Sequence, residues 1–297
     1  MAPMSEILSI LRFHIVLIAI CAHLVFGWLI AGEYFWFTSL IVGLDWMLIN
    51  LANRVSDVAE DMANRIPGAE RISRAKTSFL LGYILVMAVS FVISYHFFPQ
   101  ITGWRVAIQI IGFLYSFKVI PTHRGRIRLK DLYFFKNFLS GLGFLFTCFG
   151  YTLALSGYNP RIGWTAVIAL ALFFLPFELT YEIFYDLRDI EGDRQENVHT
   201  YPVVHGRGGA IGIINGLLIV STVIICGAFF SGMIGAREFL MVAAPAIQFA
   251  LFRHAYKTGP TIEQCIYATH LGSGLLLFYL AGTAIWLRIG LPENLYL

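Results

Sequence analysis

The chain has 297 residues, of which 58% are hydrophobic and only 13% are charged, and its formal net charge is +3. A soluble globular domain carries about 25% charged residues, so this composition excludes an ordinary soluble domain. No basic stretch is interleaved with aromatic residues as in a nucleic-acid-binding groove, so we expect no nucleic-acid partner.

Nine long apolar runs follow one another and leave no room for a separate soluble domain. A helix that crosses a bilayer needs about 20 largely apolar residues. In lipid every backbone polar group must find a partner inside the protein, which favours helices. We therefore predict an all-α, polytopic membrane protein, with residues 1–297 as one domain and nine transmembrane helices in a bundle around a central cavity. The predicted helices are 10–31, 35–52, 77–98, 104–120, 132–156, 164–185, 208–231, 238–256 and 262–287.

The Lys and Arg residues predict the orientation of this bundle. Most of the 21 lie at the N-terminus and in the connections after the second, fourth, sixth and eighth helices. By the positive-inside rule these segments are cytoplasmic, and an odd number of helices then puts the C-terminus across the membrane. We expect a multi-pass protein of the bacterial plasma membrane, with these connections on the cytoplasmic side.

The second predicted helix leads into the stretch "NRVSDVAED", which contains Asn53, Asp57 and Asp61 at four-residue intervals. Residues four apart share one face of a helix, because 3.6 residues make a turn. Asn50 precedes this cluster, and Asp45 continues the stripe deeper into the membrane.

The sixth predicted helix ends in a similar stretch, "YDLRDIEGD". It carries Asp186, Asp189 and Asp193, again largely at the spacing of helical turns. Deeper on the same helix lie Glu178, Glu182 and Tyr185. Both acidic clusters are predicted to lie on the cytoplasmic side.

Like charges four residues apart repel, and ionisable groups near a membrane are costly, so both clusters need partners. One interpretation pairs them with nearby arginines at 54, 65, 188 and 194. The other places a divalent cation between them. The clusters contain no His or Cys, which argues against zinc, whereas Mg²⁺ binds through carboxylates, water and substrate phosphates. The predicted metal ligands are Asn53, Asp57, Asp61, Asp186, Asp189 and Asp193.

Basic side chains beside such a metal would hold a diphosphate and stabilise departing pyrophosphate. The connection "KVIPTHRGRIRLKD" is the densest basic stretch on the predicted cytoplasmic side. The predicted diphosphate-binding cations are Arg65, Lys118, Arg128, Lys130 and Arg194.

A diphosphate at a membrane surface, with its tail among apolar helices, suggests an isoprenyl diphosphate. Its ionisation produces an allylic cation, which needs a dry cavity with electron-rich walls. The 26 Phe and 14 Tyr residues supply such walls, although each is also an ordinary packing residue. The predicted cavity residues are Asp45, Asn50, Glu178, Glu182 and Tyr185. Asp45 has two interpretations: a neutral, hydrogen-bonded packing residue, or a cavity residue that steers the cation or binds an acceptor.

Several motifs resemble those of the UbiA superfamily of intramembrane prenyltransferases. The matching features are the first Asp motif followed by Arg65, the second followed by Arg194, the stretch "TYPV" from Thr200, and "YSFK" from Tyr115 to Lys118. The resemblance covers about residues 12–207. It implies two Mg²⁺ ions, a diphosphate cradled between the motifs, a lateral opening to lipid, and Tyr115 as a further diphosphate-binding residue. The implied catalytic residues are Asp57, Asp61, Asp189 and Asp193.

The start of the first helix departs from the family pattern. Many members have an Arg-Pro pair and an Asn there, whereas this chain has Phe13 and His14. Three functions therefore stay open. The first is Mg²⁺-dependent prenyl transfer to a hydrophobic acceptor, aromatic or lipidic, and the second is terpene cyclisation of a prenyl diphosphate. The third is transport with the buried acids as a cation relay, which predicts flux without pyrophosphate release.

Overall fold

The computed structural model describes residues 4–123, 125–195 and 197–292, and helix is present in all nine predicted runs. The long helices are α2 (Phe13–Ala31), α3 (Trp36–Ser56), α6 (Lys76–Phe97), α7 (Thr102–Ser116), α8 (Phe135–Leu145), α10 (Trp164–Gln195), α11 (Tyr201–Phe230), α13 (Ala243–Ala255) and α14 (Ile262–Arg288). A π-helical segment, Phe146–Gly150, continues α8 into α9 (Tyr151–Leu155). The short helices are α1 (Met4–Ile10), α4 (Val58–Ala63), α5 (Ala69–Arg74) and α12 (Ala236–Phe239).

Six of these helical segments are long and apolar enough to cross a membrane: α2, α6, α8 with α9, α10, α11 and α14. The predicted all-helical architecture is confirmed. The other three long helices, α3, α7 and α13, fall outside this group. Helices α7 and α13 have only 15 and 13 residues, and α3 carries the polar residues of the first motif.

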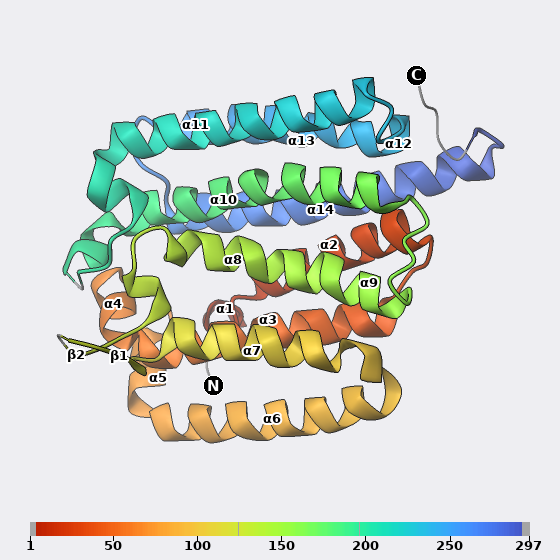
Figure 1. Cartoon of the computed structure of the whole chain (residues 1–297). Coiled ribbons are helices and arrows are strands. Elements are labelled where there is room, and N and C mark those ends of the chain that lie inside the picture. The colour runs from red at the N-terminus through yellow and green to blue at the C-terminus, as the bar shows by residue number, and fades with distance from the viewer. Residues whose placement is uncertain (1–3, 124, 196, 293–297) are drawn as a thin grey trace.

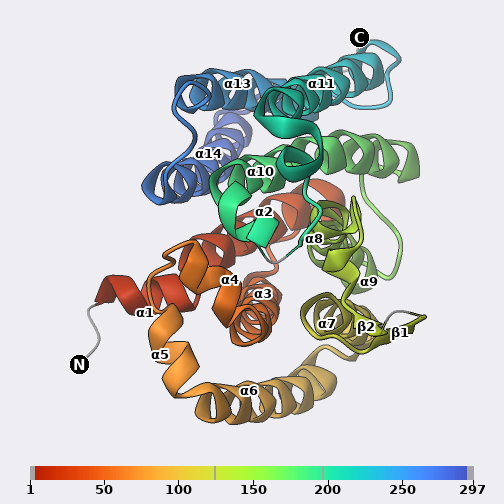
Figure 2. The same ribbon diagram turned by 90° about the vertical axis from the view of Figure 1, so that its left-hand side faces the viewer.

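The long helices lie side by side in one bundle (Figure 1). Helix α10 packs along α11, and α2 packs against both α3 and α14. The end-on view shows α6 at one edge of the bundle and α11 with α13 at the other (Figure 2). The short helices α4 and α5 gather at one end of the bundle, and α12 lies at the opposite end. Because both acidic motifs end helices at the α4 end, the topology brings them together there.

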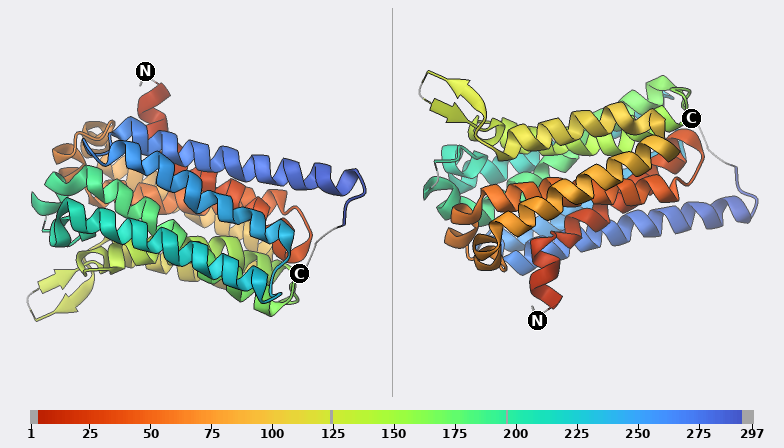
Figure 3. Two further views of the ribbon diagram at one scale, coloured as in Figure 1. Left: turned by 90° about the horizontal axis from the view of Figure 1, so that it is seen from above. Right: turned by 90° about the horizontal axis from the view of Figure 1, so that it is seen from below.

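A small β-hairpin interrupts the helical pattern after α7. The run predicted to stay helical to residue 120 ends as helix at Ser116, and β1 (Ile120–Thr122) pairs antiparallel with β2 (Gly125–Ile127). Pro121 lacks a backbone donor and Gly125 has a φ of 122°, which suits a turn rather than a helix. The hairpin projects from the α4 end of the bundle, beyond the ends of the neighbouring long helices (Figure 3).

Asp45 lies in a fully buried ion pair that connects α3 to α7 and α9. Arg105 donates from Nε to Asp45 Oδ2 at 2.9 Å and from Nη2 to Oδ1 at 2.6 Å. Tyr151 and Gln109 donate to the same carboxylate at 2.8 and 3.1 Å. The remaining guanidinium donor, Nη1, reaches the Ser90 carbonyl on α6 at 2.9 Å. This network ties four helices together and gives every oxygen of Asp45 a partner.

Candidate active site

A cavity of about 150 Å³ lies at the α4 end of the bundle, and both acidic motifs line it. Asn53 and Asp61 contribute from α3 and α4, and Asp186 and Asp189 contribute from α10. The predicted residues that also line it are Tyr115, Lys130, Asn50, Glu178, Glu182 and Tyr185. Asp45, Asp57 and Asp193 are not among the described residues that line this cavity; all three are buried outside it.

The first motif bends at Asp57, which joins α3 to α4 with non-helical dihedral angles. Helical hydrogen bonds continue across the bend, because the Asp61 amide donates to the Asp57 carbonyl at 2.8 Å. The Asp57 carboxylate accepts a hydrogen bond from Arg128 at 2.7 Å and another from Lys130. Lys130 also reaches Glu60 at 2.8 Å. The basic connection therefore packs directly against the first motif.

Glu60 on α4 lies in a strongly positive environment formed by the basic residues near the first motif. Burial acts to raise the pKa of Glu60, but the nearby ammonium groups of Lys130 and Lys136, with Arg128, lower it to about 2. Glu60 therefore stays ionised at neutral pH, and it holds Lys130 at the wall of the cavity.

Lys136 at the start of α8 connects the acids of the second motif. Its ammonium group lies 2.9 Å from Asp186 and 3.0 Å from Asp193. Asn137 donates a further hydrogen bond to Asp186 at 2.7 Å. Asp189, one turn along α10 from Asp186, is paired with its neighbour Arg188.

The two motifs are also joined through the backbone. The Gly192 amide on α10 donates to the side-chain oxygen of Asn64, which follows α4, at 3.1 Å. A Cβ atom at position 192 would lie 2.3 Å from the Asn64 amide nitrogen. A side chain at position 192 would displace the Asn64 side chain, so glycine permits this hydrogen bond between α10 and the residue that follows α4.

The predicted diphosphate-binding residues occupy three kinds of position in the structure. Tyr115 and Lys130 line the cavity, and Arg128 lies behind it on Asp57. The three residues that are exposed, and not among the described lining residues, are Arg65, Lys118 and Arg194.

Sequence analysis did not select Lys136, Arg12 and His14, which do line the cavity. Lys136 begins a membrane-length apolar segment. A charge in that position is a signal that would have found it, because such residues usually have a partner or a function. The same signal marks Arg12, which directly precedes the membrane-length segment Phe13–Ala31, whereas His14 was noted only as a departure from the family pattern.

The cavity contains side-chain oxygen atoms that suit Mg²⁺ as ligands. The side-chain oxygen of Asn53 is buried with no hydrogen-bond partner among the residues that the structure describes, and the carboxylates of Asp61, Asp186 and Asp189 share its cavity. Hard oxygen ligands of this kind fit Mg²⁺. In the part of the chain that the structure describes, no three His, Cys, Asp or Glu side chains form a ready-made metal site. The carboxylates are paired with basic groups instead, so a metal would have to displace these.

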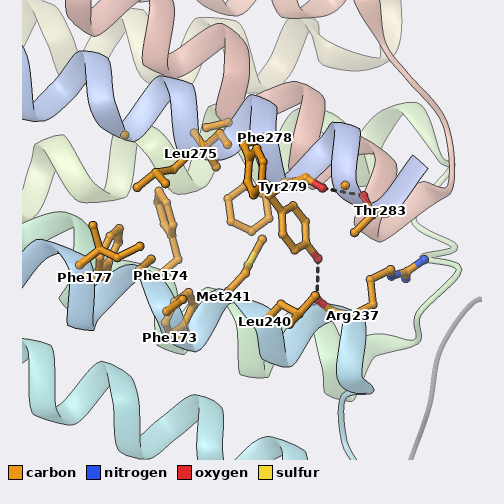
Figure 4. Close-up of a pocket in the computed structure, with 18 of the residues that line it drawn as sticks. Phe173, Phe174, Phe177, Arg237, Leu240, Met241, Leu275, Phe278, Tyr279 and Thr283 are labelled. Atoms are coloured by element: carbon orange, nitrogen blue, oxygen red, sulfur yellow. Dashed lines mark hydrogen bonds between the residues drawn. The ribbon is translucent and has the colours of Figure 1, made fainter. Parts of the chain in front are cut away.

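A second, larger cavity of about 430 Å³ adjoins the first. The residues that line both are Ile18, Phe144, Glu178 and Tyr181. Around the larger cavity, Phe173, Phe174 and Phe177 of α10 lie with Leu275 and Phe278 of α14 (Figure 4). Near one end Tyr279 donates to the Arg237 carbonyl at 2.7 Å. The small polar cavity therefore continues into an almost entirely apolar one, with Glu178 at the junction.

Comparison with known proteins agrees with this architecture. Residues 10–280 match the UbiA prenyltransferase family. A curated relative, digeranylgeranylglyceryl phosphate synthase from Methanobrevibacter smithii, is 27% identical over 210 residues, which cover 68% of this chain and 69% of the relative. A UbiA homologue from Archaeoglobus fulgidus, solved with GPP and Mg²⁺, superposes with a TM-score of 0.71 at 16% identity, over 92% of this chain and 97% of that one. An apo UbiA homologue from Aeropyrum pernix K1 gives 0.63 at 12% identity, over 93% and 98%.

Proposed function

This chain belongs to the UbiA prenyltransferase family, and on that premise we propose that it ionises an isoprenyl diphosphate and transfers the prenyl group to a lipidic or aromatic acceptor, releasing pyrophosphate. The observation that carries the proposal is the pair of adjoining cavities. The polar one combines the acids of both motifs with Lys130 and Lys136, and the other is apolar. A prenyl diphosphate has the same division into a charged head and an apolar tail.

We propose that two Mg²⁺ ions bind with the diphosphate, and that Asn53, Asp61, Asp186 and Asp189 hold them. When bound, the metal neutralises the diphosphate and assists its departure. These carboxylates would hold the metal in place of their basic partners. Lys136, which is paired with Asp186, and Lys130 at the cavity wall would bind the phosphate oxygens through their compact positive charges.

We propose that the prenyl tail occupies the apolar cavity. Its aromatic walls, which include Phe144, Phe173 and Phe174, keep water from the reacting carbon. The faces of these rings carry negative electrostatic potential, so they stabilise an allylic cation. This environment keeps the cation available for an acceptor rather than for hydrolysis.

We further propose that all nine long helices cross the membrane, with the N-terminus and the α4 end on the cytoplasmic side. The basic connections and both acidic motifs lie at that end, as the positive-inside rule requires. A fluorescent reporter in the β-hairpin should report the cytoplasm, and one at the C-terminus the opposite side. Both reporters on one side would contradict this topology.

Terpene cyclisation is the second candidate, because the wall of the apolar cavity is rich in aromatic rings. In a cyclase the substrate's own double bond captures the cation, so no acceptor is needed. The apparatus for ionisation would be the same in both reactions.

The decisive experiment incubates the purified protein with Mg²⁺ and prenyl diphosphates of C10 to C20, with and without acceptors. The acceptors include a glyceryl phosphate lipid, which the name of the Methanobrevibacter smithii relative motivates. Pyrophosphate release that requires an acceptor, with a prenylated product, supports the transferase. Release without any acceptor, with a cyclic hydrocarbon product, supports the cyclase. Chelation of Mg²⁺ should stop either reaction.

A further inference from the structure

Glu178 on α10 is a buried acid that takes no part in the metal and diphosphate site. It is 7% exposed and belongs to a segment long and apolar enough to cross a membrane. The described residues give it no hydrogen bond and no counter-charge, and the charge that acts on it is that of Glu182. A buried ionisable group without a partner is costly, so one that is retained usually has a function.

The two acids that follow Glu178 on the cavity side of α10 do have partners. Glu182 accepts a hydrogen bond from Ser140 at 2.7 Å. Asp186 lies 2.9 Å from the Lys136 ammonium group. Glu178 precedes Asp186 by about two helical turns, or about 12 Å along the helix axis. It is therefore too distant to bind the same metal ion.

Glu178 lies where the two cavities meet, because it lines both of them. In the function proposed above, the diphosphate occupies the polar cavity and the prenyl tail occupies the apolar one. The reacting carbon of a prenyl diphosphate joins its charged head to its apolar tail. That carbon would therefore lie at the junction, beside Glu178.

Gln248 on α13 has a second unpaired oxygen at nearly the same level of the bundle. It is 1% exposed and lines the apolar cavity. Its amide nitrogen donates to Thr180, two residues from Glu178, whereas its side-chain oxygen is buried with no partner in the described part of the chain. Buried polar groups are normally paired, so two acceptor groups at one level of a largely apolar cavity point to a ligand that brings an O–H donor there.

We propose that Glu178 is the general base of the transfer reaction and that, with Gln248, it binds the hydroxyl group of the acceptor. The proposal rests on the prenyl transfer proposed above and assigns the acceptor a nucleophilic alcohol or phenol. The acceptor oxygen forms a bond to the allylic carbon, while the bond from that carbon to the diphosphate breaks and pyrophosphate leaves with the electron pair. The hydroxyl proton passes to the Glu178 carboxylate.

The surroundings of Glu178 suit this step. The positive charge that develops on the allylic carbon provides the counter-charge that the described residues do not supply, and the interaction is strong because the cavity is apolar. The phenyl rings of Phe144 and Phe177 line the same cavity and exclude water, which would otherwise compete with the acceptor for the cation.

The turnover test compares the wild-type protein with Glu178→Gln, using geranylgeranyl diphosphate, Mg²⁺ and either an alkylglycerol phosphate or 4-hydroxybenzoate as the acceptor. With the acceptor that is used, we expect kcat for the prenylated product to fall about 10²–10⁴-fold, as when a general base is lost. Glutamine keeps the shape and the hydrogen bonds, so both KM values should stay within about threefold. Glu191→Gln, on the same helix but exposed, is the matched control and should keep the wild-type kcat.

Two outcomes of this experiment fail in different ways. A Glu178→Gln variant that forms the prenylated product within threefold of the wild-type rate would overturn the general base and leave prenyl transfer intact. A wild-type protein that prenylates neither acceptor and converts the diphosphate to a hydrocarbon would overturn prenyl transfer, and the base with it.

The pH dependence gives a readout that a packing role would not change. Without the base, turnover depends on ionisation of the acceptor itself, so kcat of Glu178→Gln should rise steadily with pH and approach the wild-type value in alkaline buffer. The titratable groups that interact with Glu178 in the described structure are Glu182, Tyr181 and Cys148, and both proteins retain them. A constant ratio of the two kcat values across the pH range would overturn the base.

Gln248 is tested through the binding of the acceptor. Gln248→Met removes the unpaired oxygen, so the KM for the acceptor should rise at least threefold while the KM for the prenyl diphosphate stays within about twofold. An unchanged acceptor KM, or a rise in the donor KM instead, would overturn the assignment of Gln248 to the acceptor.

A stability measurement needs no turnover. Glu178→Met removes a carboxyl group that is buried without a partner and replaces it with a side chain of similar size. We expect its thermal unfolding midpoint to be higher than that of the wild type, although it forms no prenylated product. A lower midpoint in both Glu178→Met and Glu178→Gln would show that the carboxyl group stabilises the fold, and would overturn the proposal.

Discussion

Two buried charge networks in this protein differ in how completely they are satisfied. Around Asp45, four hydrogen bonds from Arg105, Tyr151 and Gln109 reach one carboxylate at 3.1 Å or less, and neither Asp45 nor Arg105 is exposed. Around the acidic motifs, the Asn53 side-chain oxygen, the Asn50 amide nitrogen and the Arg54 Nε atom have no hydrogen-bond partner among the described residues, and all three residues line a cavity.

The difference distinguishes buried ionisable groups that stabilise the fold from those that line a ligand-binding site. A polar group buried without partners costs free energy that a closed network avoids. The Asp45 network is closed around the carboxylate and the Arg105 guanidinium and holds helices together, although the Gln109 side-chain oxygen beside it is buried without a partner among the described residues. The motif network keeps unpaired oxygen and nitrogen atoms at a cavity wall, which is the arrangement expected where a ligand completes the set. Four predictions test this distinction.

The largest effect is expected in the closed network. Arg105→Met leaves the Asp45 carboxylate buried without its counter-charge, and the loss of one partner from a buried pair costs about 3–5 kcal/mol. We expect a correspondingly large fall in thermal stability, measured in detergent by unfolding followed through tryptophan fluorescence. The double variant Asp45→Leu with Arg105→Met should recover most of the loss. A single variant as stable as the wild type would show that the pair is not structural.

The next effect concerns the motif network, where activity rather than stability should change. Asp189→Asn keeps the shape and a hydrogen-bond acceptor for Arg188 but removes the charge proposed to bind metal. We expect pyrophosphate release to fall on the order of 10²–10³-fold, as when one preorganised electrostatic group is lost, with an unchanged melting temperature. Glu191→Gln, on the same helix but exposed, is the matched control. Near-normal turnover of Asp189→Asn at limiting Mg²⁺ would contradict the metal assignment.

A smaller effect is expected at Asn53, whose buried side-chain oxygen has no hydrogen-bond partner in the described part of the chain. Asn53→Ala removes no side-chain oxygen contact from the protein, so stability should change little. If that oxygen binds Mg²⁺, the concentration of Mg²⁺ required for half-maximal turnover should rise about tenfold.

Tyr151→Phe is the matched variant in the Asp45 network. It should lower stability by about 1–3 kcal/mol, because it removes a hydrogen bond to a charged group, and leave the Mg²⁺ requirement unchanged.

The smallest effect is expected from an exposed pair. A hydrogen bond from Arg71 lowers the pKa of Glu6 below its ordinary value of 4.5. The pair therefore stabilises the fold above about pH 4.5, and this contribution is lost as the pH falls through the depressed pKa. Glu6→Gln should lower the melting temperature slightly at about pH 6 and progressively less as the pH falls below 4.5, and added salt should shrink the difference. An effect as large as that of Arg105→Met would show that exposure does not distinguish these pairs.

Much of the architecture was accessible from the sequence because lipid restricts the choice of structure. Apolar runs of membrane length become helices, so helix was expected, and is found, in all nine runs. The exception was the end of the predicted helix 104–120. Helix α7 ends at Ser116, and a hairpin that contains Pro121 and Gly125 follows it. Helical spacing likewise predicted that acids from 53–61 and from 186–193 belong together, and several of them share one cavity.

The basic partners were harder to predict. Arg65, Lys118 and Arg194 are closest in sequence to the motifs or their connections, yet they are exposed. Lys136 and Arg12, from other parts of the chain, reach the cavity instead. Long basic side chains carry no periodic signal, and their targets depend on which helices become neighbours.

The sequence alone determined that this protein is a helical bundle in a membrane with two acidic motifs at one end, because hydrophobicity and helical periodicity are local properties. The tertiary structure decided that Asp45 pairs with Arg105 across 60 positions of the chain, that the Gly192 amide meets the Asn64 side chain, and that Arg12 and Lys136 reach the cavity of the acidic motifs. These features depend on helix packing, where distance in space is independent of distance in sequence.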